Sequence, residues 1–489
     1  MGVVLHQTSK NTLIIFLGFL VGGLNVLFLY THFLEDDYYG LVTFLLSTAN
    51  ILLPLMIFGM QHTIIKFFSS YRSKTDRDNF LITAVFLPIL IILPLGFLGS
   101  LFYGFIAEIL SKENIIIKDY TWLIYFLAIF MGYFEVFYAW SKVRFQSVFG
   151  NFIREMFARI SISFLLFAVY FKWLNSEEFI YAIVLVYMVR MLIMMVYAFR
   201  LYMPDTHQYS KPKDLKEILR FSVYIIMAGS AGTILLEIDK FMIPQLQQIA
   251  NVAYYAVGVY IASVIAIPSR AMQQIVNPIT AKALNRNNMA EVEDLYKKSS
   301  VNLLIAGGLL FLLINLNVKD LYFIIDKPEY TVGIAVVLII SVSEMFKLAA
   351  GTNSAILTNS KYYKILFYFS LGMAGSVIVL NRIFIERYGI NGAALATLIV
   401  VVLFNLIKLW YVYKKLQIHP VTKKTWIVVL LIVGMYLVFK HFDLSSIALL
   451  NIVLKSVIIV IIYIFLVYKL NISREFNDQI NLRFFRKRS

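Results

Sequence analysis

Residues 235–243 read LLEIDKFMI, and this stretch indicates how the sequence is organised. It contains three charged residues, Glu237, Asp239 and Lys240, although apolar segments flank it on both sides. A charged side chain inside such a segment is energetically costly if the segment spans a membrane. Its presence near the middle of the chain therefore requires a structural or functional reason.

The surroundings of this stretch repeat a pattern from the start of the chain. Residues 253–260 read AYYAVGVY, and residues 37–44 read DYYGLVTF. In both places a long apolar segment leads through a short turn to a Tyr-Tyr pair and a second apolar segment. Pro268 and Pro54 follow the two pairs at nearly the same distance. We interpret the chain as an internal repeat whose second copy begins near Lys216.

The composition predicts an integral membrane protein. Of the 489 residues, 60% are hydrophobic, and the mean hydropathy is +0.78. A soluble domain could not bury that much apolar surface. Apolar runs of about 18 residues or more recur along the chain, and each is long enough to cross a bilayer as a helix. The first run is followed by EDD at 35–37 instead of a small-residue cleavage site, which indicates a first span and not a signal peptide.

We predict an all-α fold of about fourteen transmembrane helices, arranged as two pseudo-symmetric six-helix lobes plus two C-terminal helices. The N-lobe is predicted at 1–202, a linker at 203–216, and the C-lobe at 217–413. Residues 414–489 hold spans thirteen and fourteen and a basic tail. The predicted spans are 11–33, 40–68, 80–106, 119–141, 150–171, 178–201, 217–244, 251–276, 298–316, 331–357, 362–381, 389–412, 425–440 and 447–468.

The distribution of Lys and Arg predicts the orientation. Loops on one predicted side hold 27 of these residues, and loops on the other side hold 8. Because cytoplasmic loops are enriched in Lys and Arg, we expect both termini and the linker to be cytoplasmic in a bacterial inner membrane. The net charge of +16 is explained by basic loops facing anionic membrane lipids, so no nucleic-acid partner is expected.

No pattern in the sequence indicates an enzyme. The chain has no cysteine, which excludes disulfides, thiolate metal sites and cysteine catalysis. We find no phosphate-binding Gly-rich loop, no HExxH and no nucleophile elbow. The loops on the predicted outer side are short. We therefore expect no enzymatic activity, no metal and no cofactor.

Charged residues within predicted spans four to six form the first candidate site. They are Glu135, Arg154, Glu155, Arg159 and Arg190. One interpretation is a cluster of ion pairs that holds these helices together, because buried membrane charges usually pair. The other is that the surplus arginine faces a cavity and binds an anionic head group, since the planar guanidinium donates bidentately to phosphate.

Glu237, Asp239 and Lys240 form the second candidate site. Glu237 and Lys240 are three residues apart, so they can pair on one helix face, with the lysine near the membrane interface. The alternative is a carboxylate that couples Na⁺ or H⁺ or gates the outer opening, and Glu135 is a further candidate for that role.

Two basic residues near the inner ends of predicted spans are further head-group candidates. Arg270 follows Pro268, where a kink would place a cation beside an inner cavity. Lys66 lies with His62 at the matching part of the first repeat. For both Arg270 and Lys66 the alternative is a side chain that reaches the lipid headgroups.

Several short motifs, together with the repeat and the predicted topology, resemble the polysaccharide flippases of the multidrug/oligosaccharidyl-lipid/polysaccharide (MOP) superfamily, which also contains the MATE transporters. The matching pieces are Tyr39-Gly40, Phe58-Gly59, Asp239-Lys240, the run YYAVG at 254–258 and the run GINGAA at 389–394.

This resemblance implies a MATE-like, V-shaped fold of two six-helix lobes with a cationic cavity. It also implies transport of an undecaprenyl-pyrophosphate-linked oligosaccharide, such as an O-antigen, capsule or exopolysaccharide unit, from the inner to the outer leaflet. The expected partners are that substrate and membrane lipids, with a polysaccharide polymerase and chain-length machinery as candidate protein partners.

Three other functions remain open. An ion-coupled multidrug or cation antiporter of the same superfamily would need an acidic cavity, whereas nearly every intramembrane carboxylate here has a basic neighbour within reach by spacing. A peptidoglycan lipid II flippase would share the fold and the charge of the head group. A polysaccharide polymerase or ligase would need a sizeable outer loop, which the sequence lacks.

Overall fold

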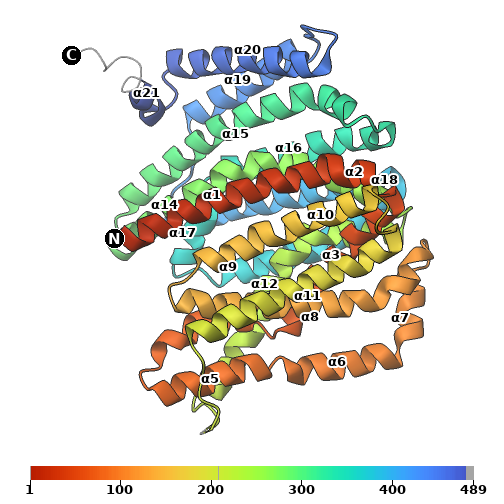
Figure 1. Ribbon diagram of the computed structural model, residues 1–489. Coiled ribbons are helices and arrows are strands. Elements are labelled where there is room, and N and C mark those ends of the chain that lie inside the picture. The colour runs from red at the N-terminus through yellow and green to blue at the C-terminus, as the bar shows by residue number, and fades with distance from the viewer. Residues whose placement is uncertain (1, 208, 481–489) are drawn as a thin grey trace. The chain divides into compact units, whose positions relative to one another are not determined.

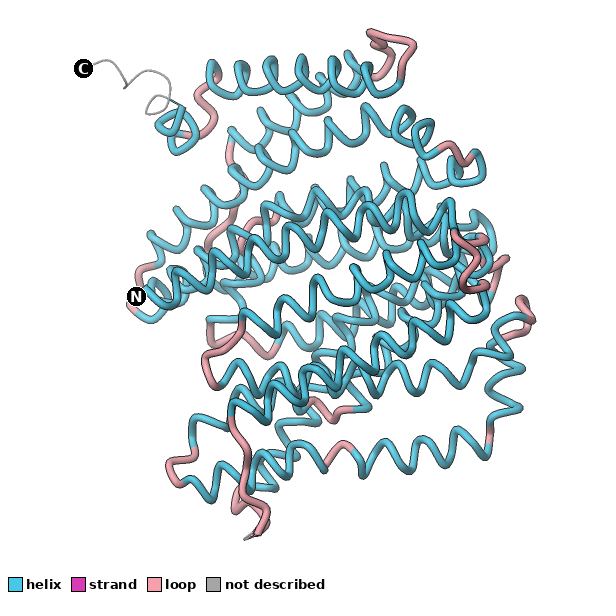
Figure 2. Tube along the Cα trace, viewed as in Figure 1, coloured by secondary structure: helices cyan, strands magenta, loops and turns pink. Residues whose placement is uncertain are grey.

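A computed structural model describes residues 2–207 and 209–480, and every regular element in that part of the chain is helical (Figures 1 and 2). The predicted all-α fold is therefore confirmed. Four basic residues of the tail that contributed to the predicted orientation lie outside the described residues, namely Arg483, Arg486, Lys487 and Arg488.

Eleven helices in the described residues are long and apolar enough to cross a membrane. They are Lys10–Phe33, Asp36–Met56, Lys74–Leu101, Ile116–Val143, Ser176–Leu201, Leu215–Gln245, Ala250–Arg270, Met289–Ile325, Pro328–Ala349, Ile365–Leu416 and Ala448–Lys469. The predicted spans 362–381 and 389–412 both lie within Ile365–Leu416, and the predicted spans 150–171 and 425–440 are not among the eleven. The count of fourteen spans stays a prediction.

The chain divides into two compact units, Met1–Ala256 and Val257–Ser489. The first contains α1 (Gly2–Leu24), α2 (Tyr30–Phe33), α3 (Asp36–Met56), α4 (Met60–Phe67), α5 (Lys74–Phe86), α6 (Ile89–Leu101), α7 (Tyr103–Leu110), α8 (Ile116–Val143), α9 (Val148–Phe152), α10 (Ala158–Tyr170), α11 (Ser176–Leu201) and α12 (Leu215–Met242). The boundary falls within α13 (Ala250–Ser263). The division into an N-lobe and a C-lobe joined by a linker at 203–216 stays a prediction.

Helix α8 lies at the centre of the first unit and packs against α3, α4 and α11 (Figure 1). Its buried face includes Phe134 and Trp140, both fully shielded from solvent. Gly132 lets α3 approach, because a Cβ there would lie 2.4 Å from the Ile57 side chain. Burying aromatic side chains of this size supplies much of the apolar contact that holds a helical unit together.

The segment before α12 is tied to the loop and helix that follow α4. Asn79 donates to the Ser210 hydroxyl at 2.9 Å and accepts from the Ser210 backbone at 3.0 Å. The Tyr71 hydroxyl donates to the Asp214 carboxylate at 2.6 Å, and burial with this hydrogen bond raises the pKa of Tyr71. These contacts hold the second half of the basic linker against the segment that follows α4.

The second helix of each sequence repeat is interrupted at a similar place. In the first repeat, Phe58 and Gly59 have left-handed backbone angles (φ 49° and 65°) and separate α3 from α4. In the second, a short 3₁₀ segment at Val264–Ala266 separates α13 from α14. The kink predicted near Pro268 therefore corresponds to a break between α13 and α14, and the break between α3 and α4 lies just beyond Pro54.

The two Tyr-Tyr motifs also meet inside the first unit. A Cβ on Gly40 would lie 2.1 Å from the Ile249 carbonyl oxygen, so only glycine allows α3 to approach the chain before α13. The Tyr254 hydroxyl donates to Asp36 at 2.9 Å. This close approach explains why a Gly follows the first Tyr-Tyr pair.

The second unit is built around α15 (Met289–Ile325), which packs against α14 (Ile267–Asn285), α16 (Ile334–Ala349), α19 (Lys423–Phe439) and α20 (Ala448–Lys469). The remaining helices are α17 (Asn353–Asn359), α18 (Ile365–Leu416) and α21 (Arg474–Ile480). Tyr463 of α20 is buried and donates to the Ile305 carbonyl of α15 at 2.9 Å. In Figure 1, α19 and α20 run along α15.

Helix α18 contains a sharp kink at Gly389, whose φ of 58° and ψ of −139° are not helical. Gly392 lies against the preceding part of the helix, because a Cβ there would be 1.9 Å from the Phe384 carbonyl oxygen. Both glycines belong to the GINGAA run at 389–394. The GINGAA run therefore forms the kink between the two helical segments of α18.

Candidate functional site

The candidate site is built on a π-helical segment in the first unit. This segment, Ile153–Phe157, separates α9 from α10 and carries Arg154 and Glu155. The wider π turn changes the direction of these side chains relative to a regular helix, and such segments occur frequently at functional sites. A second π segment, Asn25–Leu29, lies nearby, and its Asn25 donates to the Arg159 carbonyl at 2.8 Å.

Four of the five predicted charges form a chain of ion pairs. Glu135 of α8 lies 3.5 Å from Arg154. Arg154 lies 3.8 Å from Glu155, and Glu155 lies 2.9 Å from Arg159. The interpretation as an ion-pair cluster is therefore confirmed for these four residues.

Arg190 of α11 differs from the other four. Arg190 is only 8% exposed, and its guanidinium lies 3.9 Å from the centre of the Phe134 ring. It forms no ion pair with a described residue, and its Nε has no hydrogen-bond partner there. Arg190 is within electrostatic range of Glu135 and Arg154. Its charge is therefore held by an aromatic face, which compensates only part of the cost of burial.

A cavity of about 300 Å³ opens beside this cluster. It is lined by Asn50, Leu53, Pro54, Gln61, His62, Ile65, Glu135, Lys142, Arg154, Gly229 and Thr233, which come from α3, α4, α8, the π segment and α12. The break between α3 and α4 creates one wall. The Gln61 side-chain oxygen is buried without a partner among the described residues, so the wall retains unused hydrogen-bonding capacity.

The cavity is positively charged. Lys142 and Arg154 outnumber the single carboxylate of Glu135. Lys142 lies 3.8 Å from the centre of the Tyr138 ring. The Arg154 side chain is partly accessible, with 45% of it exposed. The arrangement suits an anionic ligand, because Arg and Lys can both donate to phosphate oxygens.

Lys142 is not among the site residues predicted from the sequence, because it follows the end of the predicted span 119–141. A signal existed: Glu135 and Lys142 are seven residues apart, which places them on one face of a helix. No pattern in the sequence indicates that Gln61 and Thr233 line the cavity, because their positions depend on how α4 and α12 pack.

Lys66 and Arg270, the other predicted basic residues, are not among the residues that line this cavity. Lys66 is exposed, 3.8 Å from the centre of the Phe221 ring, and does not line the cavity. Arg270 is exposed on α14 and has no ion pair among the described residues. Both observations agree with side chains that reach the headgroup region, and a role in binding the head group stays a prediction for each.

The structure confirms the predicted pair in the stretch at 235–243. Glu237 and Lys240 lie 2.7 Å apart. Asp239 is 5% exposed and accepts a hydrogen bond from Tyr255 of the second Tyr-Tyr pair. Glu344 and Lys347 of α16 likewise form a pair at 2.7 Å.

The described residues contain no group of three or more His, Asp or Glu side chains placed to hold a metal ion.

Comparison with known proteins gives one family and several similar folds. The family model described as "Polysaccharide biosynthesis protein" matches residues 8–285. No curated protein sequence matches the chain.

The solved structures share the fold at low sequence identity. The lipid II flippase MurJ in an inward closed conformation superposes with a TM-score of 0.72 at 15% identity, over 95% of this chain and 99% of MurJ. An inward-facing multidrug resistance MATE transporter of the MOP superfamily gives 0.58 at 13% identity, over 78% and 95%. A mutant of the Vibrio cholerae MATE transporter VcmN gives 0.53 at 13% identity, over 85% and 98%.

Proposed function

Because the chain belongs to the family of polysaccharide biosynthesis proteins, we propose that it is a flippase for a lipid-linked oligosaccharide. The substrate would be carried on undecaprenyl diphosphate and moved from the inner to the outer leaflet by alternating access. The observation that carries this proposal is the cationic cavity lined by Arg154, with the buried Arg190 within electrostatic range of Glu135 and Arg154. The diphosphate is the part of such a substrate that this cavity can recognise.

Arg154 is the residue best suited to make the first contact. It is partly exposed and lies 3.5 Å from Glu135, longer than a close ion pair. A phosphate can therefore replace the carboxylate as its partner with little loss. Lys142 and His62 line the same cavity and add donors. Glu135 remains nearby as a competing anion, which favours release of the phosphate after transport.

The pairing of the carboxylates argues against a cation antiporter. Glu135, Glu237 and Glu344 each have a basic partner within 4 Å. A cation substrate would need an acidic site, whereas this cavity has more basic than acidic residues. A lipid II substrate offers the same diphosphate, so it is the second candidate, favoured by the likeness of the fold to MurJ.

The Glu237–Lys240 pair is the candidate for coupling transport to Na⁺ or H⁺. Its side chains are each 19% exposed, so the pair is shielded but accessible. A carboxylate that exchanges Lys240 for an ion during the transport cycle would make transport respond to that ion's gradient. Replacing Glu237, Asp239 and Lys240 with Gln, Asn and Gln should leave folding intact and remove this response.

The proposal is tested with purified protein in vesicles. Undecaprenyl diphosphate carrying a fluorescent oligosaccharide is placed in both leaflets, and a membrane-impermeant quencher reports how fast the label reaches the outside. The protein should accelerate this exchange, and Arg154→Gln together with Lys142→Gln should lower the rate by about tenfold or more, because two phosphate donors are lost.

Two comparisons make the test decisive. The matched control replaces Arg144 and Arg200, two exposed arginines outside the cavity, with Gln and should retain the rate. Fluorescent lipid II and a cationic dye are offered in parallel vesicles. Faster transport of lipid II than of the oligosaccharide carrier would favour the second candidate, and transport of the dye alone would refute a flippase for anionic lipids.

A further inference from the structure

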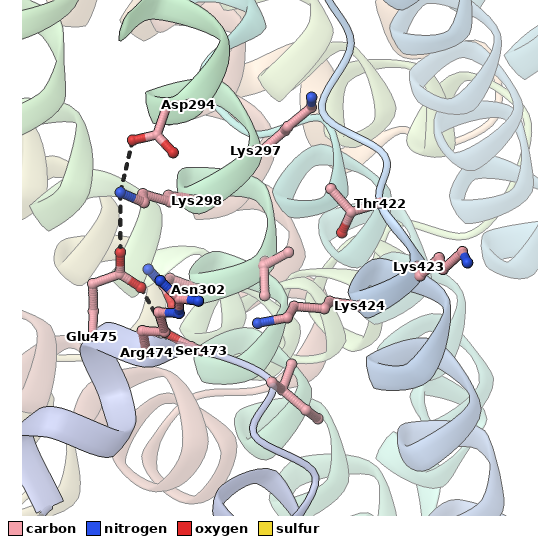
Figure 3. Close-up of a pocket in the computed structure, with 12 residues that line it drawn as sticks. Asp294, Lys297, Lys298, Asn302, Thr422, Lys423, Lys424, Ser473, Arg474 and Glu475 are labelled. Carbon is pink, nitrogen blue, oxygen red and sulfur yellow. Dashed lines mark hydrogen bonds and ion pairs between the residues drawn. The ribbon is translucent and has the colours of Figure 1, made fainter.

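A second cavity lies in the second unit, between the first turns of α15, the start of α19 and the junction of α20 and α21 (Figure 3). Its volume is about 510 Å³. It is lined by Asp294, Lys297, Lys298, Val301, Asn302, Thr422, Lys423, Lys424, Ile472, Ser473, Arg474 and Glu475. We call it the basic cavity, and nothing in the proposed transport mechanism uses it.

The two carboxylates of the basic cavity are already engaged by one lysine. Lys298 lies 2.7 Å from Asp294 and 3.5 Å from Glu475, as the dashed lines in Figure 3 show. Lys297 is paired with Glu293 at 2.6 Å. The carboxylates of the cavity therefore have little capacity left to neutralise its other cations.

Lys423, Lys424 and Arg474 form no ion pair with any described residue. In Figure 3, Lys424 extends toward the side of the cavity where Asn302 and Arg474 lie, whereas Lys423 points away. Two cations that face one cavity repel each other, and an anion between them removes that repulsion. The N-terminus of α19 starts here and adds the positive end of a helix dipole.

The basic cavity also has an apolar side. Val301 and Ile472 line it and are buried. One turn beyond Lys423, α19 carries an exposed apolar stripe of Trp426 (63% exposed), Leu430 (70%) and Leu437 (64%). Tryptophan at the start of such a stripe is typical of the membrane interface. This stripe lies on the opposite face of α19 from Lys424, so it marks the part of the helix that enters the membrane, at the depth where ligands with a charged head and hydrocarbon chains are found.

We propose that the basic cavity binds the phosphate group of an anionic phospholipid, with Lys424 and Arg474 as its main contacts. The Lys and Arg distribution places this face on the predicted cytoplasmic side, where anionic lipids attract basic residues. The acyl chains would extend from the cavity into the surrounding membrane. The bound lipid would hold α19 and α21 together at the base of the last two long helices, and this role is independent of the transported substrate.

Lipid binding is measured by native mass spectrometry of the full-length protein in detergent, titrated with phosphatidylglycerol or phosphatidylcholine. The protein should bind phosphatidylglycerol about tenfold more tightly than phosphatidylcholine, because the contacts recognise net negative charge. Lys424→Gln with Arg474→Gln should weaken phosphatidylglycerol binding by about tenfold and leave phosphatidylcholine binding unchanged.

The matched control is Lys361→Gln with Lys364→Gln, which removes two exposed charges outside the cavity. The charge-preserving pair Lys424→Arg with Arg474→Lys should retain binding, so a folding defect is distinguished from the loss of charge. An equal loss in the control would show only a general surface effect and would overturn the site. Displacement of the lipid by inorganic phosphate at an equal concentration would show a site for free phosphate and overturn the lipid assignment.

Discussion

Arg190 carries a positive charge that no carboxylate among residues 2–207 and 209–480 neutralises directly. It lies on the ring of Phe134, is 8% exposed, and its Nε lacks a hydrogen-bond partner among the described residues. A buried charge without a full set of partners destabilises a folded protein. Under the proposed function, this charge would contribute to the binding of an anionic head group in the nearby cavity.

We expect substitutions of Arg190 to separate stability from transport. Arg190→Met should leave the thermal midpoint unchanged or raise it, because it removes an unpaired buried charge, while transport in the vesicle assay falls by about tenfold or more. Arg190→Lys keeps the charge but loses the planar fork and should also reduce transport.

Arg200→Lys on the exposed end of the same helix is the control and should leave both the thermal midpoint and transport unchanged. If Arg190→Met lowered the midpoint and preserved transport, Arg190 would be structural and the anion-binding role would be wrong.

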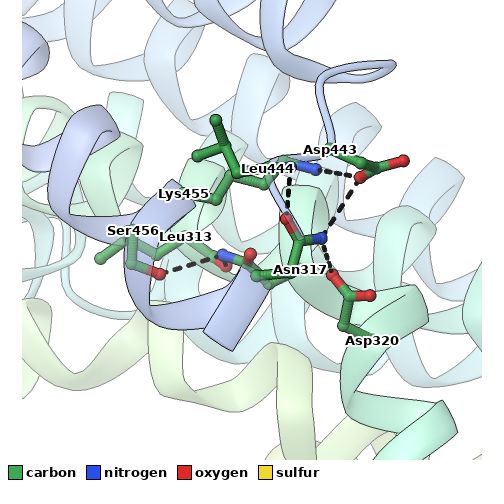
Figure 4. A network of polar contacts seen from close by, with 8 residues as sticks. Leu313, Asn317, Asp320, Asp443, Leu444, Lys455 and Ser456 are labelled. Carbon is green, nitrogen blue, oxygen red and sulfur yellow. Dashed lines mark hydrogen bonds and ion pairs between the residues drawn. The ribbon is translucent and has the colours of Figure 1, made fainter. Parts of the chain in front are cut away.

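Asp443 stabilises the connection between α19 and α20 through a polar network (Figure 4). Asn451 bridges Asp320 at 2.8 Å and Asp443 at 3.3 Å. Lys455, whose side chain is 3% exposed, reaches Asp443 at 3.3 Å. The hydrogen bond from Asn451 and then that from Lys455 lower the pKa of Asp443 below its usual range.

The lowered pKa of Asp443 means that its carboxylate stabilises the folded protein at neutral pH and loses this effect in acid. The folded carboxylate is easier to keep ionised than the unfolded one, so its contribution is complete above the unfolded pKa of about 3.9 and is lost as pH falls toward the folded pKa. Asp443→Asn should cost about 1 kcal/mol at pH 7, a small value because the carboxylate is largely exposed.

The wild-type and Asp443→Asn proteins are compared by thermal unfolding between pH 7 and pH 3. The difference between their midpoints should stay constant above about pH 4 and shrink as the pH falls below the unfolded pKa of about 3.9, since the contribution of the carboxylate is lost from there toward its folded pKa. A constant difference across this range would show that the network contributes without the charge of Asp443.

At the scale of single helices, α18 depends on one glycine. Gly392 has no room for a Cβ, which would meet the Phe384 carbonyl oxygen at 1.9 Å. Gly392→Ala must open the kink at Gly389, and we expect a cost of about 2 kcal/mol or more. The measurement is the thermal midpoint in detergent.

Gly375→Ala in the same helix is the matched control. A Cβ there meets nothing within 4 Å, so the substitution should be neutral or stabilising, as Gly→Ala usually is within an open helix. Equal effects of the two substitutions would show that the kink does not depend on Gly392.

The helices themselves were predictable, because long apolar runs have few alternatives to a membrane helix. The breaks were only partly predictable. Pro268 indicated a kink, but the left-handed residues Phe58 and Gly59 and the π segment at Ile153–Phe157 depend on packing. Ion pairs at helical spacing, such as Glu237 with Lys240, could be predicted from the sequence. The cavity could not, since its walls come from distant helices.

For the whole molecule, the distribution of Lys and Arg predicts which loops face the cytoplasm. The chain has no cysteine, so single cysteines can report the orientation without a background signal. Cysteines replacing the exposed residues Glu35 and Lys112 should react with an impermeant maleimide in intact cells. A cysteine replacing Thr206 should react only after the membrane is permeabilised.

The reverse labelling pattern would contradict the predicted orientation and place the basic cavity in the outer leaflet. Labelling of all three positions in intact cells would instead show that the predicted number of spans between them is wrong.

The packing of α15 also affects how the protein is made. Its face around Gly308 is covered by Ile432 of α19 and Tyr463 of α20, so it has no permanent neighbour until those helices leave the ribosome. About 100 residues separate the end of α15 from α19, which corresponds to about 5–20 s of synthesis. During that interval the face must be covered by lipid or by an insertion chaperone, and the last two long helices complete the second unit by displacing that temporary neighbour.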